Sequence, residues 1–212
     1  MVDEYKKLKF FGCINTKPKK EMILSRLGYR KNTTIQNKDF VEKLDNAIKE
    51  ASLICRIQGV YGIFQISKKE SDRVFLENHI DFKSEQLYRL LEYSDEILLM
   101  ACTVGRDIVE RISYEITEGD PVLGVIFDSV ASQTADSGID FLVHFVSKII
   151  EREGKKLTKS RYSPGYGDLG LENQKKIYST LSLDKIGIRI TEKYILEPEK
   201  SVIAIAGIER TI

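Results

Sequence analysis

The chain has 212 residues, of which 42% are hydrophobic and 31% charged, and 33 basic against 32 acidic residues give a formal net charge of +1. This composition is typical of a globular protein with a substantial core, and the even charge balance predicts no basic surface for nucleic acid or an anionic membrane. Because the longest apolar runs are also too short to cross a bilayer, we expect a cytoplasmic protein without nucleic-acid or membrane partners.

The first half of the sequence predicts alternating helices and strands. Pro18 suits the first turn of a helix that ends at Gly28. Apolar residues then recur at helical spacing from Asp39 to Cys55, which predicts a second helix. Runs of β-forming residues and capping signals predict further strands over 58–66, 73–76 and 97–104, a short helix over 84–91, and another helix after Gly105.

The strongest helix signal lies in the middle of the chain. Asp120 is a good N-cap, Pro121 suits the first helical position, and Gly154 suits the position just beyond the end. These signals predict a long helix near 120–153, about 50 Å in length at the usual rise per residue. Residues 131–138 are mostly small, so we expect either another backbone or a ligand to pack closely there.

The C-terminal region predicts one more helix and an antiparallel pair of strands. Apolar residues over 171–181 recur at helical spacing, and those over 186–190 alternate. A polar turn at 197–200 precedes an apolar strand over 202–208, which favours antiparallel pairing. Strands joined both by helices and by hairpins indicate an α+β fold, and the absence of a linker predicts a single domain over 1–212.

The segment 161–168, with the sequence RYSPGYGD, is the most informative short stretch. Arg161 can hold a carboxylate through its planar set of donors. Pro164 and Gly165 suit the centre of a type II turn, whose second central position needs a positive φ. A ligand could lie against the Gly165 peptide and under the ring of Tyr166. The alternative is a turn that only connects two elements.

This segment resembles the Arg-x-x-x-Gly-Tyr motif of the C-terminal reactivation domain of cobalamin-dependent methionine synthase. The resemblance extends over most of the chain, because similar short motifs stand at Leu27-Gly28-Tyr29, Cys102-Thr103-Val104-Gly105, Ile186-Gly187-Ile188, Thr191-Glu192 and Ser201-Val202. It implies a C-shaped α+β domain, built around a twisted antiparallel sheet, that binds S-adenosylmethionine.

The resemblance also implies a set of binding residues. Arg161, Ser163, Gly165 and Tyr166 fall on the family's motif, and its acidic partner for the ligand's amino group falls at Asp136. Asp140, one helical turn further, is a rival for that role, and a solvated helix position is the alternative for either acid. Asp168 is expected to cap the helix that follows it.

Neither a catalytic side chain nor a metal site is expected. The family's protein acts by positioning S-adenosylmethionine over a corrin, while a flavodoxin-like donor supplies an electron and the methyl group traps the reduced cobalt. No Cys or His spacing here suits zinc.

The chain lacks the family's D-x-H-x-x-G cobalamin motif, so its cobalamin would belong to a separate protein. The resemblance thus implies a reactivation module that acts in trans on a methionine synthase, as an accessory to that enzyme's methyltransferase activity. The alternatives are reactivation of another corrinoid methyltransferase and a non-catalytic scaffold for a corrinoid protein.

Overall fold

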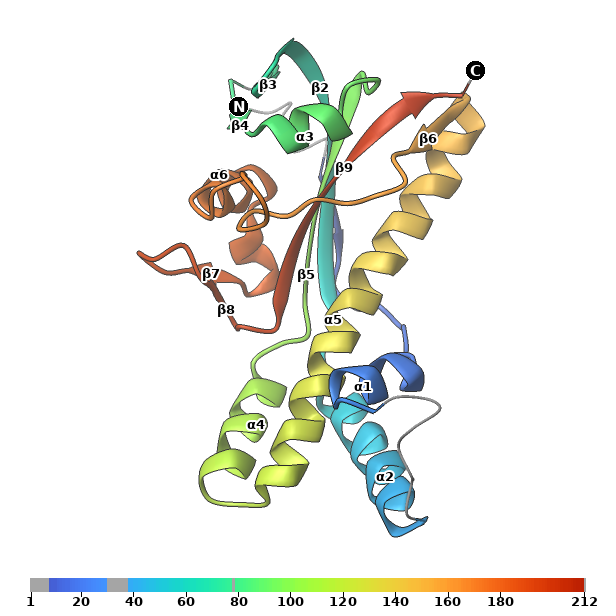
Figure 1. The fold of residues 1–212 in the computed structure, drawn as a ribbon, viewed down its shortest axis with the longest axis vertical. Coiled ribbons are helices and arrows are strands. Elements are labelled where there is room, and N and C mark those ends of the chain that lie inside the picture. The colour runs from blue at the N-terminus through green and yellow to red at the C-terminus, as the bar shows by residue number, and fades with distance from the viewer. Residues whose placement is uncertain (1–7, 30–37, 78, 212) are drawn as a thin grey trace.

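The computed structural model describes residues 8–29, 38–77 and 79–211, and an antiparallel sheet forms its centre (Figure 1). The order across the sheet is β4-β3-β2-β5-β9-β6, and β1 pairs with the first part of β2. A separate hairpin, β7–β8, follows the last helix. The strands are β1 (Leu8–Phe11), β2 (Gln58–Glu70), β3 (Arg73–Leu76), β4 (Asp81–Lys83), β5 (Glu96–Thr103), β6 (Lys155–Leu157), β7 (Arg189–Ile190), β8 (Leu196–Glu197) and β9 (Ser201–Arg210).

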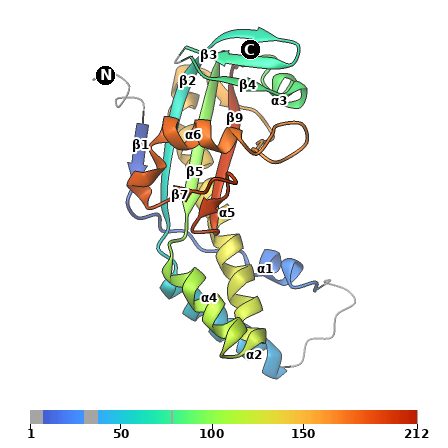
Figure 2. The ribbon, with the colours of Figure 1, turned by 90° about the vertical axis from the view of Figure 1, so that its left-hand side faces the viewer.

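Helices cover both faces of the sheet. The long helix α5 crosses one face, and α1, α2 and α4 pack around its N-terminal half (Figure 1). Figure 2 shows α6 in front of the sheet, on the face opposite α5. The helices are α1 (Lys20–Arg26), α2 (Lys38–Ile54), α3 (Glu85–Leu90), α4 (Asp107–Thr117), α5 (Pro121–Ile150) and α6 (Asn173–Leu181), with short 3₁₀ turns η2 (Glu151–Glu153) and η3 (Leu183–Ile186).

The central strand β5 separates two apolar cores. Leu98, Met100 and Cys102 belong to the core under α5. The alternate residues Ile97, Leu99 and Ala101 belong to the core under α6. Successive side chains of a strand point to opposite faces, so a strand covered on both faces reads as an unbroken apolar run. That is why the sequence over 97–104 predicted a fully buried strand.

The long helix begins and ends where its capping residues predicted. The Asp120 carboxylate accepts hydrogen bonds from the N–H groups of Val122 (2.9 Å) and Leu123 (3.3 Å), and Pro121 is the first helical residue. After 30 residues α5 gives way to η2, and Gly154 adopts a left-handed conformation with φ of 68°. The helix therefore spans the whole face of the sheet and continues into the helical end of the molecule.

The predicted α+β fold, with an antiparallel sheet and one long helix, is confirmed. Two details differ. Pro18 lies before α1 rather than inside it, and the short strands β1, β4 and β6 were not predicted, since strands of three or four residues depend on their partners rather than on their own sequence. Among the described residues, no helix is both long and apolar enough to cross a membrane.

Candidate ligand-binding site

A cavity of about 590 Å³ lies beside the first half of β9. It opens at an edge of the sheet because β6 pairs only with residues 208–210 of β9. Its volume is within the roughly 300–1,000 Å³ typical of small-molecule sites. The residues that line it are Asp136 and Ile139 of α5, Arg161, Tyr162, Ser163, Pro164 and Tyr166 of the motif, Gln174 of α6, Leu196 of β8, and Ser201, Val202, Ile203 and Ala204 of β9.

The motif is attached to β9 by backbone hydrogen bonds. The Tyr162 N–H donates to the Ile205 carbonyl at 2.9 Å, and the Ile205 N–H donates to the Tyr162 carbonyl at 2.7 Å. One residue on, the Ser163 hydroxyl donates to the Ile203 carbonyl at 2.7 Å. These contacts hold the segment along the strand edge, so the side chain of Arg161 is presented at the cavity.

The predicted turn is present. The Tyr166 N–H donates to the Ser163 carbonyl at 3.2 Å, and Gly165 has the positive φ of 92° that the second central position of a type II turn needs. The Gly165 N–H donates to the Leu169 carbonyl at 2.8 Å, and Gly165 does not line the cavity. Its part in the site is therefore to shape the turn that carries its neighbours.

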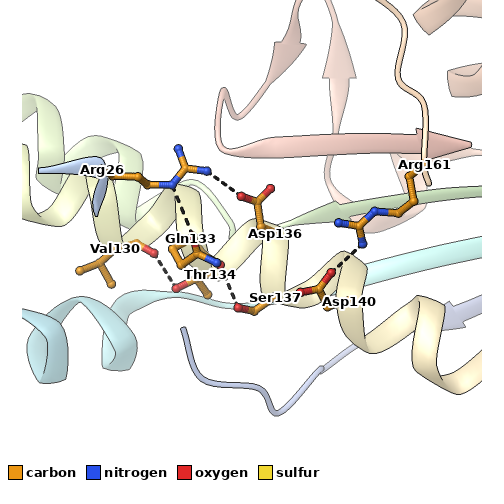
Figure 3. Close-up of polar contacts among 8 residues, drawn as sticks. All are labelled: Arg26, Val130, Gln133, Thr134, Asp136, Ser137, Asp140 and Arg161. Atoms are coloured by element: carbon orange, nitrogen blue, oxygen red, sulfur yellow. Dashed lines mark hydrogen bonds and ion pairs between the residues drawn. The ribbon is translucent and has the colours of Figure 1, made fainter. Parts of the chain in front are cut away.

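Arg161 reaches across to the long helix. Its Nη1 lies 2.7 Å from Oδ1 of Asp140 (Figure 3), with 37% of the arginine side chain and 58% of the aspartate side chain exposed. A guanidinium has several N–H donors, so one ion pair leaves others for a ligand carboxylate. Asp140 itself does not line the cavity, and its contact with the site is the ion pair with Arg161.

Asp136 is paired with a residue from the other end of the chain. Its Oδ2 lies 2.6 Å from Nη2 of Arg26, and Nε of Arg26 donates to Oε1 of Gln133 at 3.4 Å (Figure 3). Asp136 and Asp140 thus each carry an arginine partner before any ligand arrives. Each pair is partly exposed, and such pairs contribute only about 0.2–1 kcal/mol. A charged group of the ligand can therefore replace one member of either ion pair at a small cost in free energy.

The small residues of α5 are explained by the sheet. A Cβ at Gly138 would lie 2.2 Å from Sγ of Cys102 in β5 and 3.2 Å from the Ile57 side chain. Burial, with a smaller contribution from the nearby Asp136 charge, raises the pKa of the Cys102 thiol to about 12. The close packing predicted at residues 131–138 is thus with a strand, while Asp136 on the same stretch borders the cavity.

Asp168 caps a helix, but not the one that follows it. Its carboxylate accepts hydrogen bonds from the Ser84 hydroxyl at 2.5 Å and the Glu85 N–H at 2.6 Å, at the N-terminus of α3. These bonds, with the Ser84 hydroxyl contributing most, lower the pKa of Asp168. The expectation for the following helix was wrong because the start of a distant helix lies closer in space than the start of the next one.

The structure brings Arg161, Ser163, Tyr166 and Asp136 together on one cavity, although they come from segments about 25 residues apart. Arg26, Gln174 and Leu196 were not among the residues predicted from the sequence. The apolar spacing of 171–181 marked Gln174 only as a helical residue, and no local signal connects Arg26 with Asp136. Within residues 8–29, 38–77 and 79–211, no cluster of His, Cys, Asp or Glu could hold a metal ion.

No protein-family model and no curated protein matches the sequence. Among solved structures, a crystal structure of the MetH reactivation domain bound to AdoHcy is similar, with a TM-score of 0.67 and 13% sequence identity. The similarity covers 94% of this chain and 78% of that chain. The chain therefore has the fold of the MetH reactivation domain, which is the fold that the motif resemblance implied.

Proposed function

We propose that the cavity beside β9 binds S-adenosylmethionine, and that the protein serves as a reactivation module for a separate corrinoid protein. The observation that carries the proposal is the convergence of Arg161 and Asp136 on one cavity, in a fold shared with a domain that was crystallised with AdoHcy. Neither residue is close to the other in sequence, so their shared position comes from the fold.

The chemistry of the cavity fits this ligand. S-adenosylmethionine has an α-carboxylate, an α-ammonium group and a flat adenine ring. Arg161 suits the carboxylate, Asp136 suits the ammonium group, and the exposed ring of Tyr166 can cover an aromatic face. When bound, the ligand would supply an electrophilic methyl group, and these side chains would fix its orientation.

The partner would hold the cobalamin, because this sequence has no cobalamin-binding motif. The preferred partner is a cobalamin-dependent methionine synthase, with a flavodoxin-like protein as reductant. In this role the chain contributes binding and orientation rather than acid–base or nucleophilic groups. Its activity would then be seen only in the presence of the corrinoid protein.

Calorimetric titration of S-adenosylmethionine and S-adenosylhomocysteine tests the binding step. Wild-type protein is expected to bind both ligands saturably. Arg161→Ala is expected to weaken binding by about 10- to 100-fold, since hydrogen bonds to charged groups contribute about 1.5–3 kcal/mol. Arg210→Ala is the matched control, because Arg210 is also an ion-paired arginine but does not line the cavity.

A second experiment tests the role in trans. The protein is added to an inactive methionine synthase that lacks its own reactivation domain, with S-adenosylmethionine and reduced flavodoxin. Recovery of methionine formation, lost with Arg161→Ala, is the expected result. Ligand binding without recovery would instead favour another corrinoid methyltransferase or a scaffold.

A further inference from the structure

Gln174 places a buried, unpaired oxygen at the cavity. Within the described part of the chain, two buried side-chain oxygens lack a hydrogen-bond partner, Oγ of Ser94 and Oε1 of Gln174. Only Gln174 lines the cavity. Its neighbour Asn173 differs, since the Asn173 side-chain amide donates to the Gly170 carbonyl at 3.0 Å.

An unpaired oxygen in this position is unfavourable for the ligand-free protein. Leaving a buried acceptor unsatisfied lowers stability, and most buried polar groups in proteins are paired. The first turn of α6 gives no reason for the residue, because the Gln174 N–H already donates to the Leu171 carbonyl at 2.9 Å. The side-chain amide is therefore not used to begin the helix.

Gln174 belongs to α6 and therefore borders the cavity from the face of the sheet opposite to that of Asp136. Asp136 belongs to α5 on one face of the sheet, whereas α6 covers the opposite face (Figure 2). A ligand whose amino-acid group lies beside Arg161 and Asp136 would extend along β9 and bring its other end toward α6. For a nucleoside-containing ligand, that end carries the base.

We propose that Gln174 determines specificity for the base, with its side-chain carbonyl accepting a hydrogen bond from the exocyclic amino group of adenine. This inference rests on the proposed function, since it assigns one further residue to the same site. A base with a carbonyl group in place of that amino group would face the Gln174 oxygen with another acceptor. The site would prefer adenine to such a base, because binding the other base would leave the Gln174 oxygen unpaired.

The test compares S-adenosylhomocysteine with S-inosylhomocysteine, which has a carbonyl at the position of the amino group. Calorimetric affinities are measured for wild type and for Gln174→Leu, which keeps the size but removes the acceptor. Wild type is expected to prefer the adenosyl ligand, and the variant to bind it about three- to tenfold more weakly and to lose most of the preference. Gln174→Glu, which retains an acceptor, is expected to keep the preference.

Thermal unfolding of the ligand-free proteins provides the second readout. Gln174→Leu is expected to unfold at the same or a higher temperature, because an apolar group replaces an unpaired buried oxygen. A clear loss of stability would show a structural role and overturn the inference, as would an unchanged base preference. Failure of the wild type to bind either ligand would overturn the proposed function as well, whereas unchanged binding by the variant would overturn the inference alone.

Discussion

Nη2 of Arg26 lies 2.6 Å from Oδ2 of Asp136, the acid that we assign to the ammonium group of the ligand. The two residues are 110 positions apart in the sequence. The cation that neutralises Asp136 in the ligand-free protein is thus supplied by α1, from the helical end of the molecule. Binding of an ammonium group at Asp136 requires this ion pair to open or to share its carboxylate.

Arg26→Gln is therefore expected to tighten the binding of S-adenosylmethionine by about two- to fivefold, the amount that corresponds to a partly exposed ion pair. Asp136→Asn should weaken it. Both changes are measured by calorimetry at low ionic strength, where the pair is least screened. Weaker binding by Arg26→Gln would mean that Arg26 itself contacts the ligand's carboxylate.

Tyr166 offers a test of the aromatic contact. The residue is 70% exposed and lines the cavity, so a change there should leave the fold intact. Tyr166→Ala is expected to weaken S-adenosylhomocysteine binding by about tenfold, because stacking on a base contributes about 1–3 kcal/mol. Tyr166→Phe keeps the ring and should bind like the wild type; a loss with Phe would assign the effect to the hydroxyl.

Gly138 is expected to tolerate no larger side chain. The Cβ of Gly138→Ala would lie 2.2 Å from Sγ of Cys102, inside a fully buried contact. Overpacking of this kind costs about 1–3 kcal/mol, which exceeds the gain in helix propensity. Chemical denaturation should show the loss. Combining Gly138→Ala with Cys102→Ala removes the sulfur and should restore part of the lost stability. If the two substitutions changed the free energy of unfolding in a purely additive way, a direct clash between these residues would be contradicted.

Asp168 should make stability depend on pH. Its pKa is lowered in the folded protein, so its contribution is present above the unfolded-state pKa and is lost as the pH falls through the folded-state value. Asp168→Asn is expected to lower stability by about 1 kcal/mol at neutral pH, as for a lost helix cap.

The difference between wild type and Asp168→Asn should begin to shrink below about pH 4, where the carboxylate becomes protonated in the unfolded chain, and should be lost as the pH falls through the lower folded-state pKa. Thermal unfolding measured from neutral to acid pH checks this. A difference that stays constant over the whole range would show that the charge of Asp168 is not what stabilises the start of α3.

The sequence by itself determined the features that depend on neighbouring residues. Asp120, Pro121 and Gly154 define the ends of the long helix through local hydrogen bonds and backbone preferences, and all three act as predicted. The unbroken apolar run over 97–104 likewise identified the central strand, because a strand that is buried on both faces needs no polar positions. The turn at Pro164 and Gly165 depends only on their φ preferences.

The tertiary structure decided everything that joins distant segments. Arg26 meets Asp136, and Asp168 caps α3 rather than the next helix, because these pairs are close only after the sheet and α5 have packed. Gln174 reads in sequence as an ordinary position of a helix, and its unpaired oxygen is visible only beside the cavity. Ion pairs and hydrogen bonds act over a few ångströms, so their partners are fixed by the packing of whole elements and not by local sequence.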